Sequence, residues 1–461
     1  MLDKPIIEKL KNIVGKKYVL TSPEDLICYS YDSTFAESRP DVVVSPATAE
    51  EVSQVMQMAY QEEIAVVPRG MGSGLAAASI PFSGGIALSL TRMNRILEID
   101  EENMTATVEA GVITADLQTL VEERGLFYPP DPSSIKQSTL GGNVACNAGG
   151  PRCLKYGVTG DYVLGLKVVL ADGRVLQTGG KAIKNVTGYN LTQLFVGSEG
   201  TLGVITGVLV KLISKPKYVR TALAIYPVLD DASRTVNAIL TAGIVPCTIE
   251  IMDDTTISTI EEYMHLGLPV GAAAVLILES DGGDQDVVAR EIEAMAEIAR
   301  RHGASGVRVA ETDAERAELW RGRRSVGPSL AQRRPNKLGE DISVPRSQVP
   351  EAVRRIKEIS RKYNLPIVVF GHAGDGNLHP NILFDKRDEE EWGRVEQAVG
   401  DIFTMAVELG GTLSGEHGVG TLKLPYLEMA LGPVAVDVMR SIKQAFDPKG
   451  ILNPGKVLPE P

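Results

Sequence analysis

Cysteine is scarce in this sequence of 461 residues, and its spacing excludes several kinds of redox centre. The four cysteines, Cys28, Cys146, Cys153 and Cys247, form no C-x-x-C pair and follow no iron–sulfur or zinc-finger spacing. We expect all four to be reduced, buried thiols, because free cysteine is often found in protein interiors. If this protein releases electrons, a different molecule must therefore receive them.

Long apolar runs are absent as well. The most apolar uninterrupted run covers residues 271–278, whereas a helix needs about 20 apolar residues to cross a bilayer. Residues 1–15 mix Ile, Leu and Val with Lys and Glu, which predicts an amphipathic helix rather than a signal peptide. The formal net charge of -12 disfavours binding to nucleic acid or to an anionic membrane. We therefore expect a cytoplasmic protein with no transmembrane segment and no nucleic-acid partner.

The chain is too long for one ordinary hydrophobic core, so we expect two or three domains. Thr48 followed by Glu51 is a capping-box pattern that predicts the start of a helix, and residues 64–67 predict a buried strand after it. Strand patterns continue to about residue 213, strand and helix patterns then alternate, and the pattern from about residue 388 to 446 is largely helical. The sequence predicts an α+β protein with domains at 1–213 and 218–415 and a helical C-terminal segment at 416–461.

Glycine is abundant, and residues 69–74, Arg-Gly-Met-Gly-Ser-Gly, follow the predicted strand at 64–67. Three glycines at alternate positions allow backbone N–H groups to surround a phosphate oxygen, although a tight structural turn would have the same pattern. A Rossmann site is disfavoured because no clear helix follows, and the loop lacks the Gly-Lys-Thr of a Walker motif. Two further glycine clusters, at 138–150 and 197–203, indicate a long cofactor.

Residues 1–213 resemble the FAD-binding domain of the vanillyl-alcohol-oxidase type flavoenzymes. The matching stretches are 68–74, 129–134, 139–150, 155–157 and 188–205. All five histidines follow this domain, which excludes a histidyl–flavin bond within it, and a cysteinyl bond through Cys146 or Cys153 is the remaining covalent alternative to non-covalent FAD. The resemblance implies FAD contacts from Arg69, Gly70, Met71, Gly72, Ser73, Gly74, Pro130, Asp131, Ser133, Ser134, Thr139, Gly142, Asn143, Gly149, Glu199, Gly203 and Ile205.

Two glycine-rich segments, residues 370–381 and 413–420, hold three of the five histidines. Asp375-Gly376 is typical of a two-residue hairpin turn, which would pair His372 directly with His379 and place Asn381 on the same sheet face. Directly paired residues have Cβ atoms about 5 Å apart, close enough for two imidazoles to bind one metal ion. The alternative is a solvated hairpin whose histidines have no chemical role.

Glu416 could supply a carboxylate ligand beside the two histidines, which would leave coordination positions open for a substrate, and His417 would then be free as a base. These segments resemble the C-terminal substrate domain of the FAD-linked D-lactate dehydrogenase and glycolate oxidase family. The resemblance implies that His372, His379 and Glu416 bind one divalent metal ion, with zinc, manganese and iron as candidates. It also implies that His417 is the catalytic base.

The same resemblance implies which residues contact the substrate. Arg323 and Asn381 resemble contacts to the substrate carboxylate, although Arg321 and Arg324 are neighbours of Arg323 and could take its place. The members that oxidise dicarboxylates have a lysine at the position of Gly339. The glycine here therefore favours a short monocarboxylate substrate.

These patterns together predict an FAD-dependent dehydrogenase that oxidises a small D-2-hydroxy acid, D-lactate or glycolate being favoured, to the 2-keto acid. Asn453 in the C-terminal tail is expected to approach the flavin. Electrons would pass to an external acceptor, such as an electron-transfer flavoprotein, a quinone or an iron–sulfur subunit. The alternatives are a D-2-hydroxyglutarate-type dehydrogenase, a metal-dependent hydrolase whose glycine loops bind a phosphorylated substrate, and a non-catalytic flavin-binding subunit.

Overall fold

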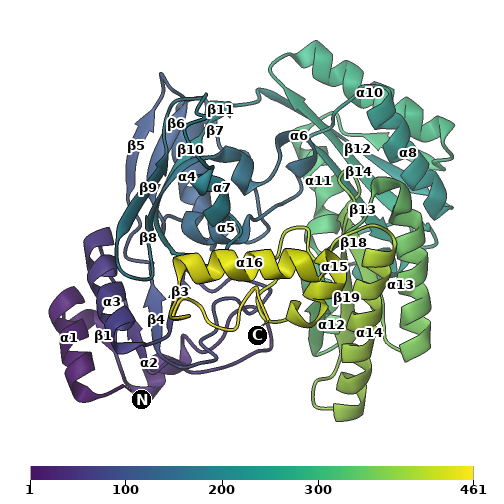
Figure 1. Cartoon of the computed structure of the whole chain (residues 1–461). Coiled ribbons are helices and arrows are strands. Elements are labelled where there is room, and N and C mark those ends of the chain that lie inside the picture. The colour runs from purple at the N-terminus through teal and green to yellow at the C-terminus, as the bar shows by residue number, and fades with distance from the viewer. Residues whose placement is uncertain (1, 460–461) are drawn as a thin grey trace. The chain divides into compact units, whose positions relative to one another are not determined.

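Separate β-sheets form the cores of two units in the computed structural model, which describes residues 2–459 (Figure 1). The first unit comprises the chain up to Gly149, Val158–Lys215 and the segment from Glu416 onward. The second unit comprises Gly150–Gly157 and Pro216–Gly415. Residues 150–157, which lie inside the predicted first domain, thus group with the second unit.

The N-terminal part of the first unit is a four-stranded sheet in the order β1–β2–β4–β3, in which β2 and β3 pair in parallel with β4. The capping pattern at Thr48 is confirmed, since its Oγ1 accepts the backbone N–H of Glu51 (3.1 Å). The strand predicted at 64–67 is β3, which begins two residues later. The elements are α1 (Lys4–Val14), η1 (Lys16–Tyr18), β1 (Val19–Leu20), α2 (Pro23–Ile27), β2 (Val42–Val44), α3 (Ala49–Glu62), β3 (Val66–Arg69) and β4 (Ile86–Ser89).

A five-stranded antiparallel sheet, in the order β5–β6–β10–β8–β9, forms the next part of the first unit. The strand patterns predicted up to about residue 213 are confirmed in this sheet. The elements are β5 (Ile96–Asp100), β6 (Thr105–Glu109), α4 (Thr114–Glu122), β7 (Leu126–Phe127), α5 (Leu140–Cys146), η2 (Thr159–Tyr162), β8 (Val163–Val169), β9 (Val175–Gly179), α7 (Leu191–Phe195), β10 (Val204–Lys211) and β11 (Ile213–Ser214).

The C-terminal segment belongs to the first unit and adds to the edge of its four-stranded sheet. The N–H of Val66 on β3 donates to the carbonyl of Ile451, and the N–H of Asn453 donates to the carbonyl of Val66 (both 2.8 Å). The segment is largely helical from Leu424 to Phe446, as predicted, and begins with a loop at residues 416–423. Its elements are η4 (Leu424–Tyr426), α15 (Leu427–Leu431) and α16 (Pro433–Phe446).

An eight-stranded antiparallel sheet is the core of the second unit, in the order β15–β12–β14–β13–β18–β19–β16, with β17 also paired to β19. Helices α8, α10, α13 and α14 pack in succession against one face, and α9, α11 and α12 enclose an apolar core on the other (Figure 1). The alternation of strand and helix patterns predicted after residue 213 is therefore confirmed.

The elements of the second unit are α6 (Cys153–Tyr156), β12 (Tyr218–Tyr226), α8 (Leu229–Thr241), β13 (Thr248–Asp253), α9 (Asp254–Met264), β14 (Ala274–Gly282), α10 (Gln285–Arg301), β15 (Gly306–Val309), α11 (Asp313–Arg324), α12 (Val326–Arg333), β16 (Asn336–Gly339), β17 (Ile342–Ser343), η3 (Arg346–Gln348), α13 (Val349–Tyr363), β18 (Ile367–His372), β19 (Asn377–Phe384) and α14 (Glu389–Glu408).

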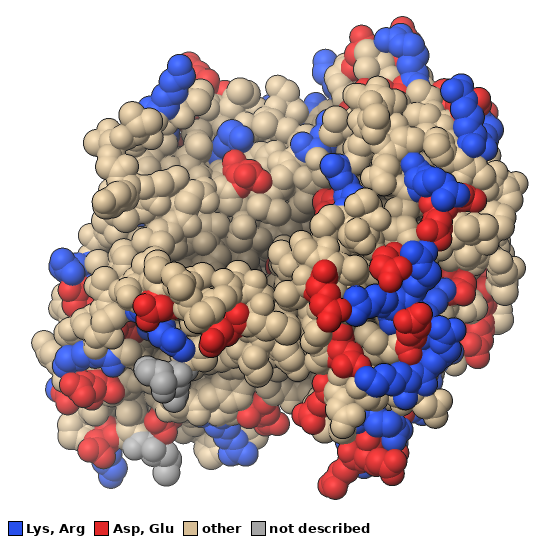
Figure 2. Space-filling view, turned by 45° about the vertical axis from the view of Figure 1, so that its right-hand side comes forward, with Lys and Arg blue, Asp and Glu red and all other residues tan. Residues whose placement is uncertain are grey.

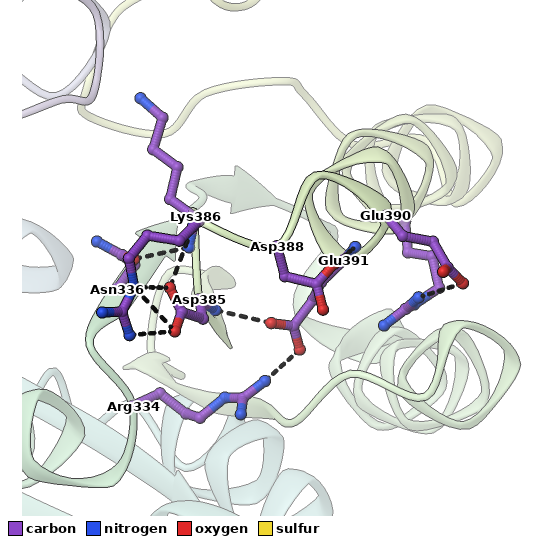
Figure 3. A network of polar contacts seen from close by, with 9 residues as sticks. Arg334, Asn336, Asp385, Lys386, Asp388, Glu390 and Glu391 are labelled. Atoms are coloured by element: carbon purple, nitrogen blue, oxygen red, sulfur yellow. Dashed lines mark hydrogen bonds and ion pairs between the residues drawn. The ribbon is translucent and has the colours of Figure 1, made fainter.

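A polar network ties the end of β19 to the start of α14 (Figure 3). Asp388 caps the helix, since its Oδ1 accepts the N–H of Glu391 (3.0 Å). The buried carboxylate of Glu391 accepts the N–H of Asp385 (2.7 Å) and pairs with Arg334, which precedes β16. One carboxylate thus holds three segments of the second unit together.

The cysteines differ in part from the expectation. All four are free, but Cys28 is exposed and Cys146 and Cys153 are half-buried, so the prediction that all of them are buried holds for Cys247 alone. Burial, together with the carboxylates of Glu199 and Asp32, raises the pKa of Cys146 to about 12, so this thiol stays protonated at neutral pH. A protonated thiol is a poor nucleophile, which argues against a cysteinyl–flavin bond through Cys146.

The surface carries charges of both signs. On the face drawn in Figure 2, basic and acidic side chains are intermixed. In the part of the chain that the structure describes, no helix is both long and apolar enough to span a bilayer.

Candidate functional site

The histidine hairpin has a longer loop than its sequence predicted. Strand β18 ends at His372 and β19 begins at Asn377, so the loop has four residues rather than two. His372 pairs with Asn377 and Phe370 pairs with His379, so the predicted direct pairing of the two histidines was wrong. The loop is closed by the N–H of Gly376, which donates to the carbonyl of His372 (3.0 Å) from a left-handed conformation with a φ of +82°.

The two imidazoles nevertheless meet, as diagonal neighbours on one face of the sheet. The Nε2 atoms of His372 and His379 are 3.4 Å apart, and the rings are nearly perpendicular, at 83°. Two histidine nitrogens that bind one zinc ion tetrahedrally at about 2.0–2.1 Å would lie about 3.3 Å apart. Both side chains are buried. The donor atoms and their separation therefore fit a divalent metal ion.

Glu250 is a residue of this site that the sequence did not predict. It lies on β13 directly opposite His372, and its carboxylate pairs with the Nδ1 of that ring. The other carboxylate oxygen accepts a hydrogen bond from the Nε of Arg323 (2.6 Å). The only signal for Glu250 in the sequence is that it is a charged residue between two isoleucines, Ile249 and Ile251.

The charge of Glu250 is held by its two partners. Burial, which is complete for this side chain, would by itself raise the pKa of the carboxyl group. The electrostatic attraction of Arg323 and His372 and the hydrogen bonds from both outweigh burial, so the net effect is a lowered pKa. The carboxylate form is therefore the form that these contacts favour.

Arg323 is the member of its arginine cluster that turns toward the histidines. It lies in the last turn of α11, and its guanidinium stacks over the ring of Phe370 at 4.5 Å. Phe370 also packs against His379, with ring centroids 5.7 Å apart. Arg321 and Arg324 are exposed, and Arg324 donates to the carbonyl of Ala317. The choice of Arg323 among the three arginines is therefore supported by its position.

Asn381 is buried on the same strand face as His379, because the two residues are two positions apart on β19. Its amide nitrogen donates to the carbonyl of His379 (3.0 Å). Gly339 on β16 is its direct partner, and a Cβ at Gly339 would lie 2.9 Å from the side-chain oxygen of Asn381. Position 339 therefore controls the space beside Asn381.

Glu416 directly follows the last residue of the second unit. His372, His379 and Glu416 each offer one ligand atom, and these atoms lie within 4.8 Å of one another. The neighbouring His417 is largely buried, and its Nε2 lies 3.8 Å from a carboxylate oxygen of Glu416.

The first glycine cluster lies around a buried cation. Arg69 ends β3, and its guanidinium lies under Gly72, where a Cβ would come within 2.1 Å of it. Gly72 has a φ of +70°, which only glycine adopts easily. At Gly70 a Cβ would lie 2.4 Å from the hydroxyl of Thr139, the residue that caps α5. A buried arginine below side-chain-free backbone fits the diphosphate of a dinucleotide.

The third glycine cluster is joined to the C-terminal segment. Both carboxylate oxygens of Glu199 accept backbone N–H groups, from Val419 (2.7 Å) and Gly420 (2.9 Å). The side-chain amide of Asn453 donates to the carbonyl of Glu199 (2.7 Å) and to that of Ala78 (2.9 Å). Burial raises the pKa of Glu199, and the two N–H groups oppose that shift. The carboxylate of Glu199 is thus engaged by the loop that follows His417.

The remaining residues predicted to contact FAD are also on the first unit. Ser73 and Gly74 follow Gly72, and Met71 is half exposed. Pro130, Asp131, Ser133 and Ser134 lie in the loop between β7 and α5. Gly142 and Asn143 lie within α5, and Gly149 follows it. Gly203 precedes β10 and Ile205 lies within that strand.

Comparison with known proteins matches both halves of the chain to domains of FAD-linked enzymes. A sequence model described as "FAD binding domain" matches residues 40–179, and one described as "FAD linked oxidases, C-terminal domain" matches residues 215–457. The glycolate oxidase subunit GlcD of Bacillus subtilis (strain 168) is 48% identical over 99% of this chain and 97% of its own length. A D-lactate dehydrogenase of Anaerostipes hadrus is 35% identical over 98% of this chain and 97% of its own length.

Solved structures bear out the predicted α+β fold of the vanillyl-alcohol-oxidase type. A p-cresol methylhydroxylase with substrate bound has a TM-score of 0.82 at 19% identity, covering 98% of this chain and 96% of its own. The 4-ethylphenol oxidase of Gulosibacter chungangensis has a TM-score of 0.80 at 20% identity, covering 99% and 97%. With two matching domain models and full-length relatives, the chain belongs to the family of FAD-linked oxidases.

Proposed function

We propose that this protein oxidises a small D-2-hydroxy acid, D-lactate or glycolate being favoured, to the corresponding 2-keto acid. The observation that carries the proposal is the cluster of His372, His379 and Arg323 in a chain 48% identical to a glycolate oxidase subunit. A 2-hydroxy acid carries a hydroxyl group and a carboxylate on adjacent carbons. A metal-binding histidine pair beside an arginine matches both groups.

We infer that one divalent metal ion, with zinc, manganese or iron as candidates, is held by His372, His379 and Glu416. The 3.4 Å separation of the two histidine nitrogens supports this ligand set. When bound, such an ion supplies Lewis-acid chemistry that lowers the pKa of a substrate hydroxyl group. Two histidines and one carboxylate leave coordination positions open for the substrate.

The side chains of this protein would then orient the substrate and move its proton. The terminal nitrogens of Arg323 would hold the substrate carboxylate, since its Nε is taken by Glu250. Asn381 would donate to the same carboxylate. His417 would accept the proton of the substrate hydroxyl at an imidazole nitrogen. The FAD, held non-covalently by the glycine clusters of the first unit and by Asn453, supplies the acceptor for the hydride that leaves the α-carbon.

The size of the substrate is proposed from Gly339. Because a side chain at this position would press against Asn381, the glycine leaves Asn381 in place for a short substrate. No basic group is added there for a second carboxylate. A D-2-hydroxyglutarate-type activity is therefore less favoured than oxidation of D-lactate or glycolate.

The electrons are proposed to pass to an external acceptor, which would be an electron-transfer flavoprotein, a quinone or an iron–sulfur subunit. The support for this proposal is the cysteine spacing, because the four thiols follow no iron–sulfur pattern.

A substrate screen tests the proposed reaction. Purified flavoprotein is mixed without oxygen with D-lactate, glycolate, L-lactate or D-2-hydroxyglutarate, and the flavin absorbance is followed by stopped flow. We expect rapid bleaching with D-lactate or glycolate. Bleaching only with the dicarboxylate, or with no 2-hydroxy acid, would remove this proposal.

Metal analysis tests the ligand set separately. We expect about one divalent ion per chain in the wild-type protein and little in His372→Asn. His302→Asn is the matched control, since this histidine caps α10 and lies outside the ligand set. Equal metal content in wild type and His372→Asn would exclude the histidine pair as the metal site.

A further inference from the structure

The carboxylate of Glu250 contacts two residues with different proposed tasks. One oxygen pairs with the Nδ1 of His372, a proposed metal ligand, and the other accepts from the Nε of Arg323 (2.6 Å), a proposed substrate contact. We propose that Glu250 is a positioning residue that sets the tautomer of His372 for the metal ion and the direction of Arg323 for the substrate carboxylate. This inference rests on the proposed function, and it adds a residue that the proposed reaction does not itself name.

The tautomer argument follows from the chemistry of a carboxylate. An ionised carboxylate only accepts hydrogen bonds, so the Nδ1 of His372 must carry the hydrogen that it shares with Glu250. In the neutral ring the Nε2 then carries a lone pair instead of a hydrogen, and this is the atom that lies 3.4 Å from the Nε2 of His379. Metal-binding histidines generally donate their other ring N–H to a carboxylate or carbonyl, which fixes the ring orientation.

The position of the carboxylate is itself rigid. Glu250 and His372 are direct partners on the adjacent strands β13 and β18, so their backbones hold the two side chains together. The side chain of Glu250 has no exposed surface, so water does not compete for its oxygens. A contact of this kind is much stronger than the same pair at the protein surface.

Arg323 is oriented by the same carboxylate and by Phe370. Its Nε is bound to Glu250, and its guanidinium plane stacks on Phe370, so the arginine is restrained at two points. This arrangement leaves the two terminal nitrogens of Arg323 for the substrate. They form a side of the guanidinium that can bind a carboxylate in a bidentate manner. Phe370 also contacts His379. Glu250 and Phe370 therefore link the arginine to both histidines.

Glu250→Gln separates this role from simple packing, because the amide has nearly the same shape. If its oxygen accepts from Arg323, its NH2 group faces His372 Nδ1 and favours the tautomer with hydrogen on Nε2. If its oxygen accepts from His372, its NH2 group faces the Nε–H of Arg323, and two donors oppose each other. The first orientation makes both hydrogen bonds and is therefore the one expected, and it moves the hydrogen of His372 from Nδ1 to Nε2.

Glu279→Gln is the matched control. Glu279 is another buried glutamate, on the neighbouring strand β14, and one carboxylate oxygen accepts from Trp320 (2.8 Å) and Thr221 (2.6 Å). These partners are outside the proposed metal and substrate contacts. Its substitution disturbs a buried carboxylate of the same sheet without touching His372 or Arg323.

Calorimetric titration of the metal-free, FAD-loaded proteins with Mn²⁺ or Zn²⁺ tests the metal arm. We expect Glu250→Gln to weaken binding about 10- to 100-fold relative to wild type. Glu279→Gln should bind as the wild type does. Wild-type metal affinity in Glu250→Gln would overturn the proposal. Absence of binding in the wild type would instead refute the metal part of the proposed function.

A nitrogen NMR measurement decides the tautomer without any metal ion. In protein labelled with ¹⁵N-histidine, the His372 signals are identified by their loss in His372→Asn. We expect hydrogen on Nδ1 in the metal-free wild type and in Glu279→Gln, and a shift of that hydrogen to Nε2 in Glu250→Gln. A bare Nδ1 in the wild type, or the same tautomer in all three proteins, would overturn the proposal whether or not a metal ion binds.

Discussion

Two adjacent side chains, Glu416 and His417, have different proposed tasks. Glu416 is a proposed metal ligand, whereas His417 is proposed to accept the substrate proton. A residue that acts only on the proton is needed for flavin reduction and not for cofactor binding. Substitution of His417 therefore separates chemistry from binding.

We predict that His417→Ala keeps FAD and the metal ion but reduces its flavin with D-lactate or glycolate about 10²- to 10⁴-fold more slowly, the usual contribution of a general base. Stopped-flow bleaching under anaerobic conditions measures the rate, and the flavin spectrum and metal analysis measure the content. His302→Ala is the control, because this histidine is outside the site. Unchanged bleaching in His417→Ala would show that another group accepts the proton.

Asp253 makes the stability of the second unit depend on pH. Burial raises its pKa to about 6, although Thr256 donates two hydrogen bonds to the carboxyl group. Between the unfolded pKa near 3.9 and the folded value, the folded chain binds one more proton than the unfolded chain. This group's contribution to the free energy of unfolding therefore falls as pH rises through that window, by about 1.4 kcal/mol per unit.

We predict that Asp253→Asn removes this fall, because the amide does not ionise. Urea unfolding of wild type and variant at pH 4.5 and 6.5 measures it, and the difference between the two pH values should be about 2 kcal/mol smaller in the variant. Equal pH dependence in both proteins would show that Asp253 ionises normally in the folded state.

Candidate site residues could be predicted from the sequence where the residue type itself points to a function. Histidine is rare and clustered in this chain, so His372, His379 and His417 could be proposed from the sequence. Glu250 was not, because glutamate is common and its burial depends on the pairing of β13 with β18. The contacts of Arg323 likewise depend on how α11 packs, which no local pattern contains.

At the scale of elements, the carboxylate of Glu199 joins the third glycine cluster to the loop after His417. It accepts the N–H groups of Val419 and Gly420, and a Cβ at Gly418 would lie 2.8 Å from one of its oxygens. The carboxylate is thus occupied by backbone of the first unit. We therefore expect the carboxylate of Glu199 to act mainly by fixing the position of that loop.

We predict that Glu199→Gln leaves one of these N–H groups unpaired, destabilises the loop by about 1–3 kcal/mol and slows flavin reduction, while FAD stays bound. The FAD-to-protein ratio and anaerobic stopped flow measure the two effects. Glu109→Gln, a buried carboxylate on β6 that pairs with Arg95, is the control. Loss of FAD from Glu199→Gln would instead favour a direct contact of this carboxylate with the cofactor.

Elements were predictable where local signals agree with tertiary contacts. The capping pattern at Thr48 is satisfied within one helical turn, so α3 begins where predicted. At the histidine hairpin the Asp375-Gly376 preference was overridden. The N–H of Gly374 donates to the carbonyl of Ile249 (3.3 Å), and a Cβ at Gly376 would meet the carbonyl of Val344 at 2.1 Å. These contacts with distant residues select the longer loop.

At the scale of the whole molecule, chain order and unit membership differ. Residues 150–157 group with the second unit, where Lys155 (2.5 Å) and Tyr156 (2.8 Å) bond to Asp281 on β14. The segment from Glu416 onward groups with the first unit. Such assignments depend on contacts between residues far apart in sequence, which periodicity and capping patterns do not reveal.

The C-terminal segment is part of the first unit, and this has a consequence for cofactor binding. Asn453 donates to carbonyls next to two glycine clusters, and β3 bonds to Ile451, so the tail is part of the structure around the predicted FAD contacts. A ligand that binds only the folded form stabilises it, by about 2.7 kcal/mol at 100 times the dissociation constant. FAD should therefore stabilise the tail together with the N-terminal loops.

We predict that adding FAD to the flavin-free protein slows hydrogen exchange in peptides covering Arg69–Gly74 and also in peptides covering Ile451–Val457, although nearly the whole chain separates them in sequence. Mass spectrometry of the exchanged peptides measures both. The exposed peptide of residues 181–187, whose Ile183 and Val186 are almost fully solvent-accessible, shows how a segment without buried contacts responds. Protection of the N-terminal loop with no change in the tail would mean that the C-terminal segment is held independently of the cofactor, because coupled parts of one folded unit must gain stability together.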